Sequence, residues 1–172
     1  MKHKRLWAPW RYEYIETTVG SDLECFLCEA FEAKKDAERL IIYRGQEAFV
    51  ILNKYPYSNG HLLITPNRHV GDLRDLENDE LGGLFDLVAI STEWLDRSYN
   101  PQGYNIGLNL GKAAGAGLPG HLHVHVVPRW EGDTNYMPIL AGVRVISESL
   151  TATYSKLKES VELWEKKVES KR

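Results

Sequence analysis

Two segments of the chain place apolar residues at helical spacing, and the first lies near the middle. Residues 76–100, LENDELGGLFDLVAISTEWLDRSYN, carry an apolar side chain every three or four positions, which predicts one long helix. Acidic and amide residues crowd its expected first turn, and Asn100, Pro101 and Gly103 end it. The apolar positions that define this helix are Leu81, Leu84, Phe85, Val88 and Leu95.

The second stripe runs through the C-terminal part of the chain. Its members are spaced by alternating steps of four and three residues, which predicts a long amphipathic helix. Packing of this stripe onto the rest of the domain is favoured over recognition of a partner helix. The residues of the stripe are Leu150, Tyr154, Leu157, Val161, Trp164 and Val168.

Shorter apolar runs between turn residues predict strands. Residues 40–53, LIIYRGQEAFVILN, indicate two strands joined at Arg44-Gly45, and the run from His61 ends a third strand at Pro66. Two more strands are expected in YNIGLNLG (104–111) and HLHVHVVP (121–128). The order of strands, helix, strands and helix predicts an α+β fold built on an antiparallel sheet.

Length and charge narrow the class of protein. A chain of 172 residues suits one domain, here with an N-terminal arm or short helix over residues 1–20. The net charge of −3 argues against a nucleic-acid-coating role, which needs a basic excess. No apolar run reaches the length of a signal peptide or the roughly 18 residues of a membrane span. We therefore expect a cytoplasmic protein without membrane attachment.

Three of the six histidines, His121, His123 and His125, occupy alternate positions in PGHLHVHVVPRW. On a strand they share one face, and the intervening apolar residues turn to the other. Three interpretations are open: an exposed strand that happens to carry histidines, a three-histidine metal centre, and nucleophilic catalysis by one imidazole. We favour the third, because ligands on one flat strand converge poorly on an ion.

The chemistry of imidazole supports that choice. Histidine titrates near neutral pH, so its neutral form is available to attack phosphorus. The neighbouring histidines can donate to phosphate oxygens as charge builds there. The preceding loop, AAGAGLPG, has no bulky side chain beside Gly115 and Gly117, so its backbone N–H groups can approach an anion.

The run His121-Leu-His123-Val-His125-Val-Val resembles the motif of the histidine triad superfamily at every position. FVILNKYPYSNGHLLITPNRHVGD, residues 49–72, is similar to the family's upstream block. The resemblance covers about residues 23–130. LWAPWRYEYI, VVPRW and GDTNYMP are similar to the bacterial diadenosine tetraphosphate phosphorylase branch.

This resemblance implies a role for each histidine. His123 would attack the α-phosphorus to give a nucleotidyl-histidine intermediate, His125 would contact phosphate oxygens, and His121 would support the site. Asn53 would bind the ribose hydroxyls and Asn109 would lie near the bridging oxygen, although both asparagines also suit turns. The other residues expected at the substrate are His61, Gly115, Gly117, Trp130 and the stretch 133–135. Structural roles are the alternative for three of these: His61 would be a half-buried histidine, Trp130 would be a core aromatic residue, and the stretch 133–135 would be a polar turn.

The implied reaction is nucleotidyl transfer from a dinucleoside polyphosphate, with no metal needed in the chemical step. Inorganic phosphate as acceptor makes a phosphorylase, and water makes a hydrolase of dinucleoside polyphosphates or nucleoside phosphoramidates. A nucleotide-binding sensor is the alternative outside enzymes. Many family members carry Ser, Thr or Gln just before the triad, whereas residues 115–120 here offer only backbone donors. The family also implies a homodimer.

The chain has two cysteines, in Cys25-Phe-Leu-Cys28. In a cytosolic protein this spacing indicates metal or redox chemistry. Some histidine triad relatives, including the galactose-1-phosphate uridylyltransferase branch, bind structural zinc through such a pair and two histidines. The matching positions are His69 and His121, so the resemblance implies a zinc site with His121 as a ligand. A pair of free thiols is the alternative.

Overall fold

The computed structural model describes residues 25–133 and 146–171. The predicted arm over residues 1–20 and the positions 134–135 lie outside this part of the chain. The helices are α2 (Phe26–Ala33), α3 (Asp36–Arg39), α4 (Asn78–Tyr99) and α6 (Leu150–Glu169), and the strands are β1 (Ile41–Arg44), β2 (Ala48–Leu52), β3 (Leu62–Pro66), β4 (Gly103–Leu108) and β5 (Val124–Arg129). Short 3₁₀ turns span Leu73–Asp75 and Lys112–Ala114.

The five strands form one sheet in the order β1-β2-β3-β5-β4, and every neighbouring pair is antiparallel. The α+β prediction is therefore confirmed. β5 lies between β3 and β4, and its ladder with β3 ends where Ile64 pairs with Val124. β1 and β4 form the two edges of the sheet, and the middle residues of β4 are exposed.

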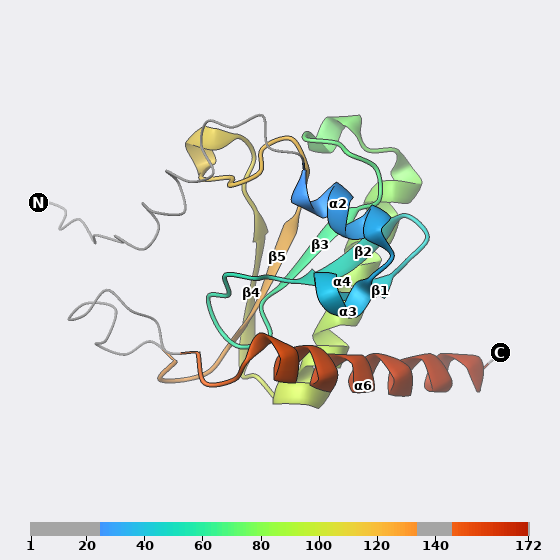
Figure 1. Cartoon of the computed structure of the whole chain (residues 1–172), viewed down its shortest axis with the longest axis vertical. Coiled ribbons are helices and arrows are strands. Elements are labelled where there is room, and N and C mark those ends of the chain that lie inside the picture. Colours follow the sequence, from blue (N-terminus) through green and yellow to red (C-terminus); the bar gives the residue numbers. More distant parts are fainter. Residues whose placement is uncertain (1–24, 134–145, 172) are drawn as a thin grey trace, which may run out of the picture.

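Helices cover both faces of the sheet (Figure 1). Because both faces are covered, β2 and β3 are buried at every position. The α4 face packs mainly leucine, valine and Trp94 from β2, β3, β5, α4 and α6 into one cluster. The opposite face packs α2 through Leu27 and Ala30 against Phe49, Ile51 and Leu63.

The sequence predicts the ends of α4 well but its buried face only in part. Glu77 and Glu80 form a reciprocal capping box at its start, and Asn100 ends it in the left-handed conformation. Leu81 and Phe85, assigned to the buried stripe, are 38% and 47% exposed. These two side chains extend the apolar stripe beyond the width that the sheet covers. The helix buries the predicted Leu84, Val88 and Leu95, together with Leu87 and Trp94, which the predicted stripe did not include.

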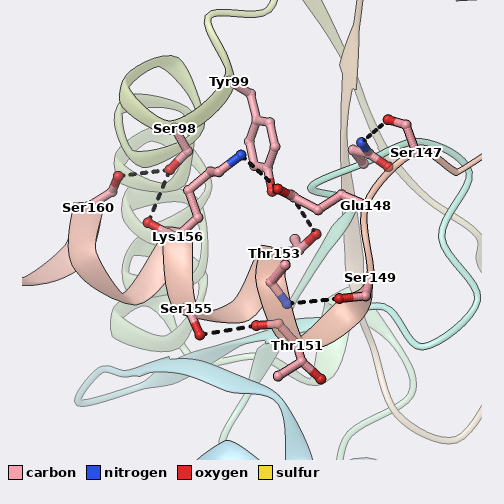
Figure 2. Close-up of polar contacts among 12 residues, drawn as sticks. Ser98, Tyr99, Ser147, Glu148, Ser149, Thr151, Thr153, Ser155, Lys156 and Ser160 are labelled. Atoms are coloured by element: carbon pink, nitrogen blue, oxygen red, sulfur yellow. Dashed lines mark hydrogen bonds and ion pairs between the residues drawn. The ribbon is translucent and has the colours of Figure 1, made fainter.

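The C-terminal helix packs onto the domain, as predicted. Leu157 and Val161 lie in the α4-side cluster, and Ser149 caps the first turn of α6. Figure 2 shows Glu148 accepting hydrogen bonds from Tyr99, Thr153 and Lys156, which fasten the start of α6 to the end of α4.

Among the helices of the described residues, none is long and apolar enough to cross a membrane.

Candidate active site and metal centre

The strand that carries the histidines is shorter than predicted. The sequence indicates a strand over residues 121–128, but β5 begins at Val124, so of the three histidines only His125 lies within it. His121 and His123 precede the β3–β5 ladder, which ends at Val124. Side-chain and loop hydrogen bonds rather than strand pairing therefore set their positions.

His123 is held in one tautomer by the backbone carbonyl of His121. Its Nδ1 lies 2.9 Å from the carbonyl oxygen of His121, and a carbonyl can only accept, so Nδ1 carries the proton. The lone pair is then on Nε2. Burial lowers the pKa of His123, although the bond to the His121 carbonyl partly opposes this effect. The result is a neutral imidazole with a nucleophilic Nε2.

His125 belongs to a chain of hydrogen bonds that starts at a backbone amide. The N–H of Tyr57 donates to Nδ1 of His61 at 3.1 Å, so the proton of neutral His61 is on Nε2. That Nε2 lies 3.0 Å from Nδ1 of His125 and donates to it. His125 therefore keeps its own proton on Nε2, as a donor suited to a phosphate oxygen.

Asn53 joins the same chain. Its Oδ1 accepts from the N–H of Tyr55 at 2.9 Å, which orients the amide. Its Nδ2 then lies 3.2 Å from Nδ1 of His61, so a second donor meets that nitrogen. His61 is fully buried, and its ring centroid is 5.2 Å from that of His125. The structure thus brings Asn53, His61 and His125 together, as the sequence predicts.

In the loop before the histidines, some backbone amides donate hydrogen bonds within the loop and others have no backbone acceptor in the described part of the chain. Gly115 is left-handed, with φ 87°, and its N–H donates to the Lys112 carbonyl at 2.9 Å. The Gly117 amide has no backbone acceptor among the residues that the structure describes. Asn109 directly follows β4, whose last residue Leu108 pairs with Val124. Asn109 therefore lies at the end of β5 that adjoins His123.

Trp130 lies away from this cluster within the chain. It follows the last residue of β5, and its ring is 6.5 Å from that of Tyr99. At the rise of a strand, it is roughly 20 Å from His123. The structure does not bring it to the three histidines.

The two cysteines meet two histidines from distant parts of the sequence. The ligand atoms of Cys25, Cys28, His69 and His121 all lie within 4.8 Å of one another. Nδ1 of His121 is 3.2 Å from Sγ of Cys25 and 3.4 Å from Sγ of Cys28, and Nδ1 of His69 is 3.3 Å from Sγ of Cys28. A tetrahedral zinc ion separates its sulfur and nitrogen ligands by about 3.3–3.8 Å. The four residues therefore fit a metal ion of this kind.

The protonation of the group also fits a metal. Nε2 of His121 donates to the Pro66 carbonyl at 2.9 Å, which leaves an unprotonated Nδ1 facing both sulfurs. Burial is the main cause that raises the pKa of Cys28, to about 11, so without a metal the thiol keeps its proton, and metal binding would have to release it. Among the described residues, His123 and His125 belong to no such group, which argues against the three-histidine metal centre.

Comparison with known proteins identifies the family. A model of the HIT domain matches residues 34–132, more than half of the chain. The chain belongs to the histidine triad (HIT) family. It is 39% identical over 156 residues to AP-4-A phosphorylase of Mycobacterium tuberculosis, which covers 87% of this chain and 80% of that protein. It is also 34% identical over 93 residues to the asymmetrical bis(5'-nucleosyl)-tetraphosphatase of Schizosaccharomyces pombe, covering 54% of this chain and 50% of that one.

A solved structure supports the HIT fold. A Zn-bound histidine triad family protein from Mycobacterium smegmatis aligns with a TM-score of 0.62 and 26% identity, covering 83% of this chain and 96% of that one. The two named relatives are enzymes, and the prediction of an enzyme is confirmed. This HIT protein is a nucleotidyltransferase or a hydrolase.

Two backbone groups that orient histidines of the site were not predicted from the sequence. The amide of Tyr57 orients His61, and the carbonyl of Pro66 orients His121. Backbone groups carry no residue signature of their own. The only available signal was position, since both lie in the block over residues 49–72 that resembles the family.

Proposed function

We propose that this HIT protein is a diadenosine tetraphosphate phosphorylase that acts through a nucleotidyl-His123 intermediate. The observation that carries the proposal is the Nδ1 bond of His123 to the His121 carbonyl, which leaves Nε2 of a buried neutral imidazole as the nucleophile. The named activity of the mycobacterial relative supports the choice of substrate.

In the first step, Nε2 of His123 attacks the α-phosphorus of one adenosine. The N–P bond forms as the P–O bond to the β-phosphate breaks, and ATP leaves. Negative charge grows on the phosphorus-bound oxygens during this step. The Nε2–H of His125, oriented by His61, is the donor that we assign to those oxygens.

In the second step, an oxygen of inorganic phosphate attacks the same phosphorus. The N–P bond breaks, His123 leaves with its lone pair restored, and ADP is released. The loop before the triad offers only backbone donors, and we assign the Gly117 amide, which has no backbone acceptor among the described residues, to an oxygen of the incoming phosphate. Asn109 follows Leu108, which pairs with Val124, and we assign it to the bridging oxygen, as the family resemblance implies.

The test is to incubate the protein with diadenosine tetraphosphate, with and without inorganic phosphate, and to identify the nucleotides formed. We expect ADP and ATP, and only when phosphate is present. AMP and ATP regardless of phosphate would make the protein a hydrolase, as the name of the yeast relative suggests for that enzyme. His123→Ala, which removes the nucleophile, is the control and should show no turnover. Binding of the nucleotide without turnover in the unmutated protein would support a sensor.

We also propose that Cys25, Cys28, His69 and His121 bind one structural zinc ion. Zinc there would cross-link the start of α2, the segment after β3 and the segment before β5, without taking part in the reaction. The distances among the four ligand atoms support this assignment. Metal analysis of the purified protein should give one zinc per chain, and Cys25→Ser with Cys28→Ser should abolish it. Zinc thiolates need a reducing compartment, which agrees with a cytoplasmic location.

Finally, we propose that the protein is a homodimer joined at β4. This strand is one of the two edges of the sheet, and it and the residues that follow expose the apolar side chains Ile106 and Leu110. An unpaired, partly apolar edge is a ready surface for a second copy. Light scattering should give the mass of two chains, and Ile106→Lys should shift it toward one.

A further inference from the structure

The segment that carries the nucleophile lies outside the regular sheet. Paired residues of β3 and β5 end at Ile64 and Val124. Extending that antiparallel register by one step would set Thr65 opposite His123, but the ladder stops first. Residues 121–123 must therefore be held in place by other bonds.

One of those bonds comes from the side chain of Thr65. The hydroxyl of Thr65 donates to the carbonyl oxygen of Leu122 at 2.7 Å. Thr65 is fully buried and Leu122 is 4% exposed, so no solvent competes for this bond. A buried carbonyl that loses its donor is strongly disfavoured.

The bond acts on the backbone unit from which His123 projects. The Leu122 carbonyl and the His123 amide nitrogen belong to one peptide plane, which is fixed by Thr65. The preceding plane joins the His121 carbonyl to the Leu122 N–H, and that N–H donates to the Val70 carbonyl at 2.7 Å. The same His121 carbonyl receives Nδ1–H of His123. Both planes that set the imidazole are thus anchored on residues 65–70.

From this arrangement we infer that Thr65 is a positioning residue for the nucleophile His123. It does not touch the substrate. Beyond the last paired residues of β3 and β5, its hydroxyl replaces the missing ladder hydrogen bond. This bond holds the backbone of His123 so that Nε2 points toward the phosphorus. The inference rests on the proposed function, because it takes His123 as the nucleophile.

The experiment compares three variants with the unmutated protein. Thr65→Val keeps the side-chain shape and removes the hydroxyl, whereas Thr65→Ser keeps the hydroxyl. The matched control is Thr153→Val, which removes another buried threonine hydroxyl, bonded to Glu148 at the start of α6. Each variant is assayed for kcat and KM with diadenosine tetraphosphate and phosphate, for melting temperature and for bound zinc.

We expect Thr65→Val to lower kcat about 10–100-fold, the range typical of a nucleophile displaced by a fraction of an ångström to one ångström. In Thr65→Val, KM and zinc content should change little. Thr65→Ser should have most of the kcat of the unmutated protein. Thr153→Val should keep kcat but have a lower melting temperature. The combination separates positioning from general destabilisation. If Thr65→Val does not fold, Thr65→Cys, with its weak donor, is expected to give an intermediate kcat.

The inference is overturned if folded Thr65→Val, or folded Thr65→Cys in its place, keeps the kcat of the unmutated protein. It is also overturned if Thr65→Ser loses as much kcat as Thr65→Val. Failure of the proposed function has a different signature, because the unmutated protein would then lack turnover or His123→Ala would retain it.

Discussion

Loss of the proposed zinc ion should destabilise the fold by a free energy that can be worked out from how far apart its ligands are in the sequence. Cys28 and His121 are 93 residues apart in the sequence. A cross-link closing a loop of that length removes unfolded-chain entropy worth about 4–5 kcal/mol. We expect the metal-free chain to stay folded, because the two hydrophobic clusters remain. For a domain of this size, Cys28→Ser should therefore lower the melting temperature by about 8–20 °C.

Calorimetry with and without a strong chelator tests this value. The chelator should lower the melting temperature of the unmutated protein toward that of Cys28→Ser, and it should leave the variant unchanged. The variant thus serves as the control for any effect of the chelator apart from metal removal. An unmutated protein that melts at the same temperature with and without chelator would refute the reasoning and leave Cys25 and Cys28 as free thiols.

Three further outcomes follow from single contacts. His61→Phe should lower kcat about 10–100-fold, because His125 loses the donor that orients it; steady-state kinetics should show His61→Gln, which retains an N–H, to be less affected. Leu157→Ala should cost about 2–5 kcal/mol of unfolding free energy in urea, with kcat unchanged while the chain is folded. Burial opposes but does not cancel the bonds from Lys156, Tyr99 and Thr153 that lower the pKa of Glu148. The ionised Glu148 carboxylate therefore stabilises the fold fully above the pKa that this group has in the unfolded chain, and this stabilisation is lost as pH falls through its lower pKa in the folded chain. The free energy of unfolding in urea should accordingly depend less on acid pH in Glu148→Gln than in the unmutated protein.

Sequence periodicity predicted α4 and α6 because each of these helices buries one face, and apolar runs between turn residues predicted the strands. The ends of α4 were predicted from capping residues, and the stripe of α6 was predicted from its spacing. Leu81 and Phe85 were misassigned because periodicity shows where a face lies but not how far the covering sheet extends. The start of β5 was misplaced for a similar reason, since the alternation of residues 121–128 continues past the last paired residue.

The candidate site was predicted mainly through side chains that carry chemistry. The histidines and cysteines of the metal group were predicted together because their types and spacing match a known pattern, and the structure brings them together. Thr65 was not predicted, because a threonine within a buried strand looks like an ordinary strand residue. Its contact depends on where the neighbouring ladder stops, which is a property of the folded sheet.

The most direct test of the account is to look for the covalent intermediate itself. The protein is mixed with diadenosine tetraphosphate in the absence of phosphate, quenched rapidly without acid, and analysed by intact mass spectrometry and peptide mapping. We predict an added AMP group on His123, which disappears as ADP forms when phosphate is supplied. An AMP group on another residue, or steady turnover with no adduct at any time after mixing, would contradict nucleophilic catalysis by His123.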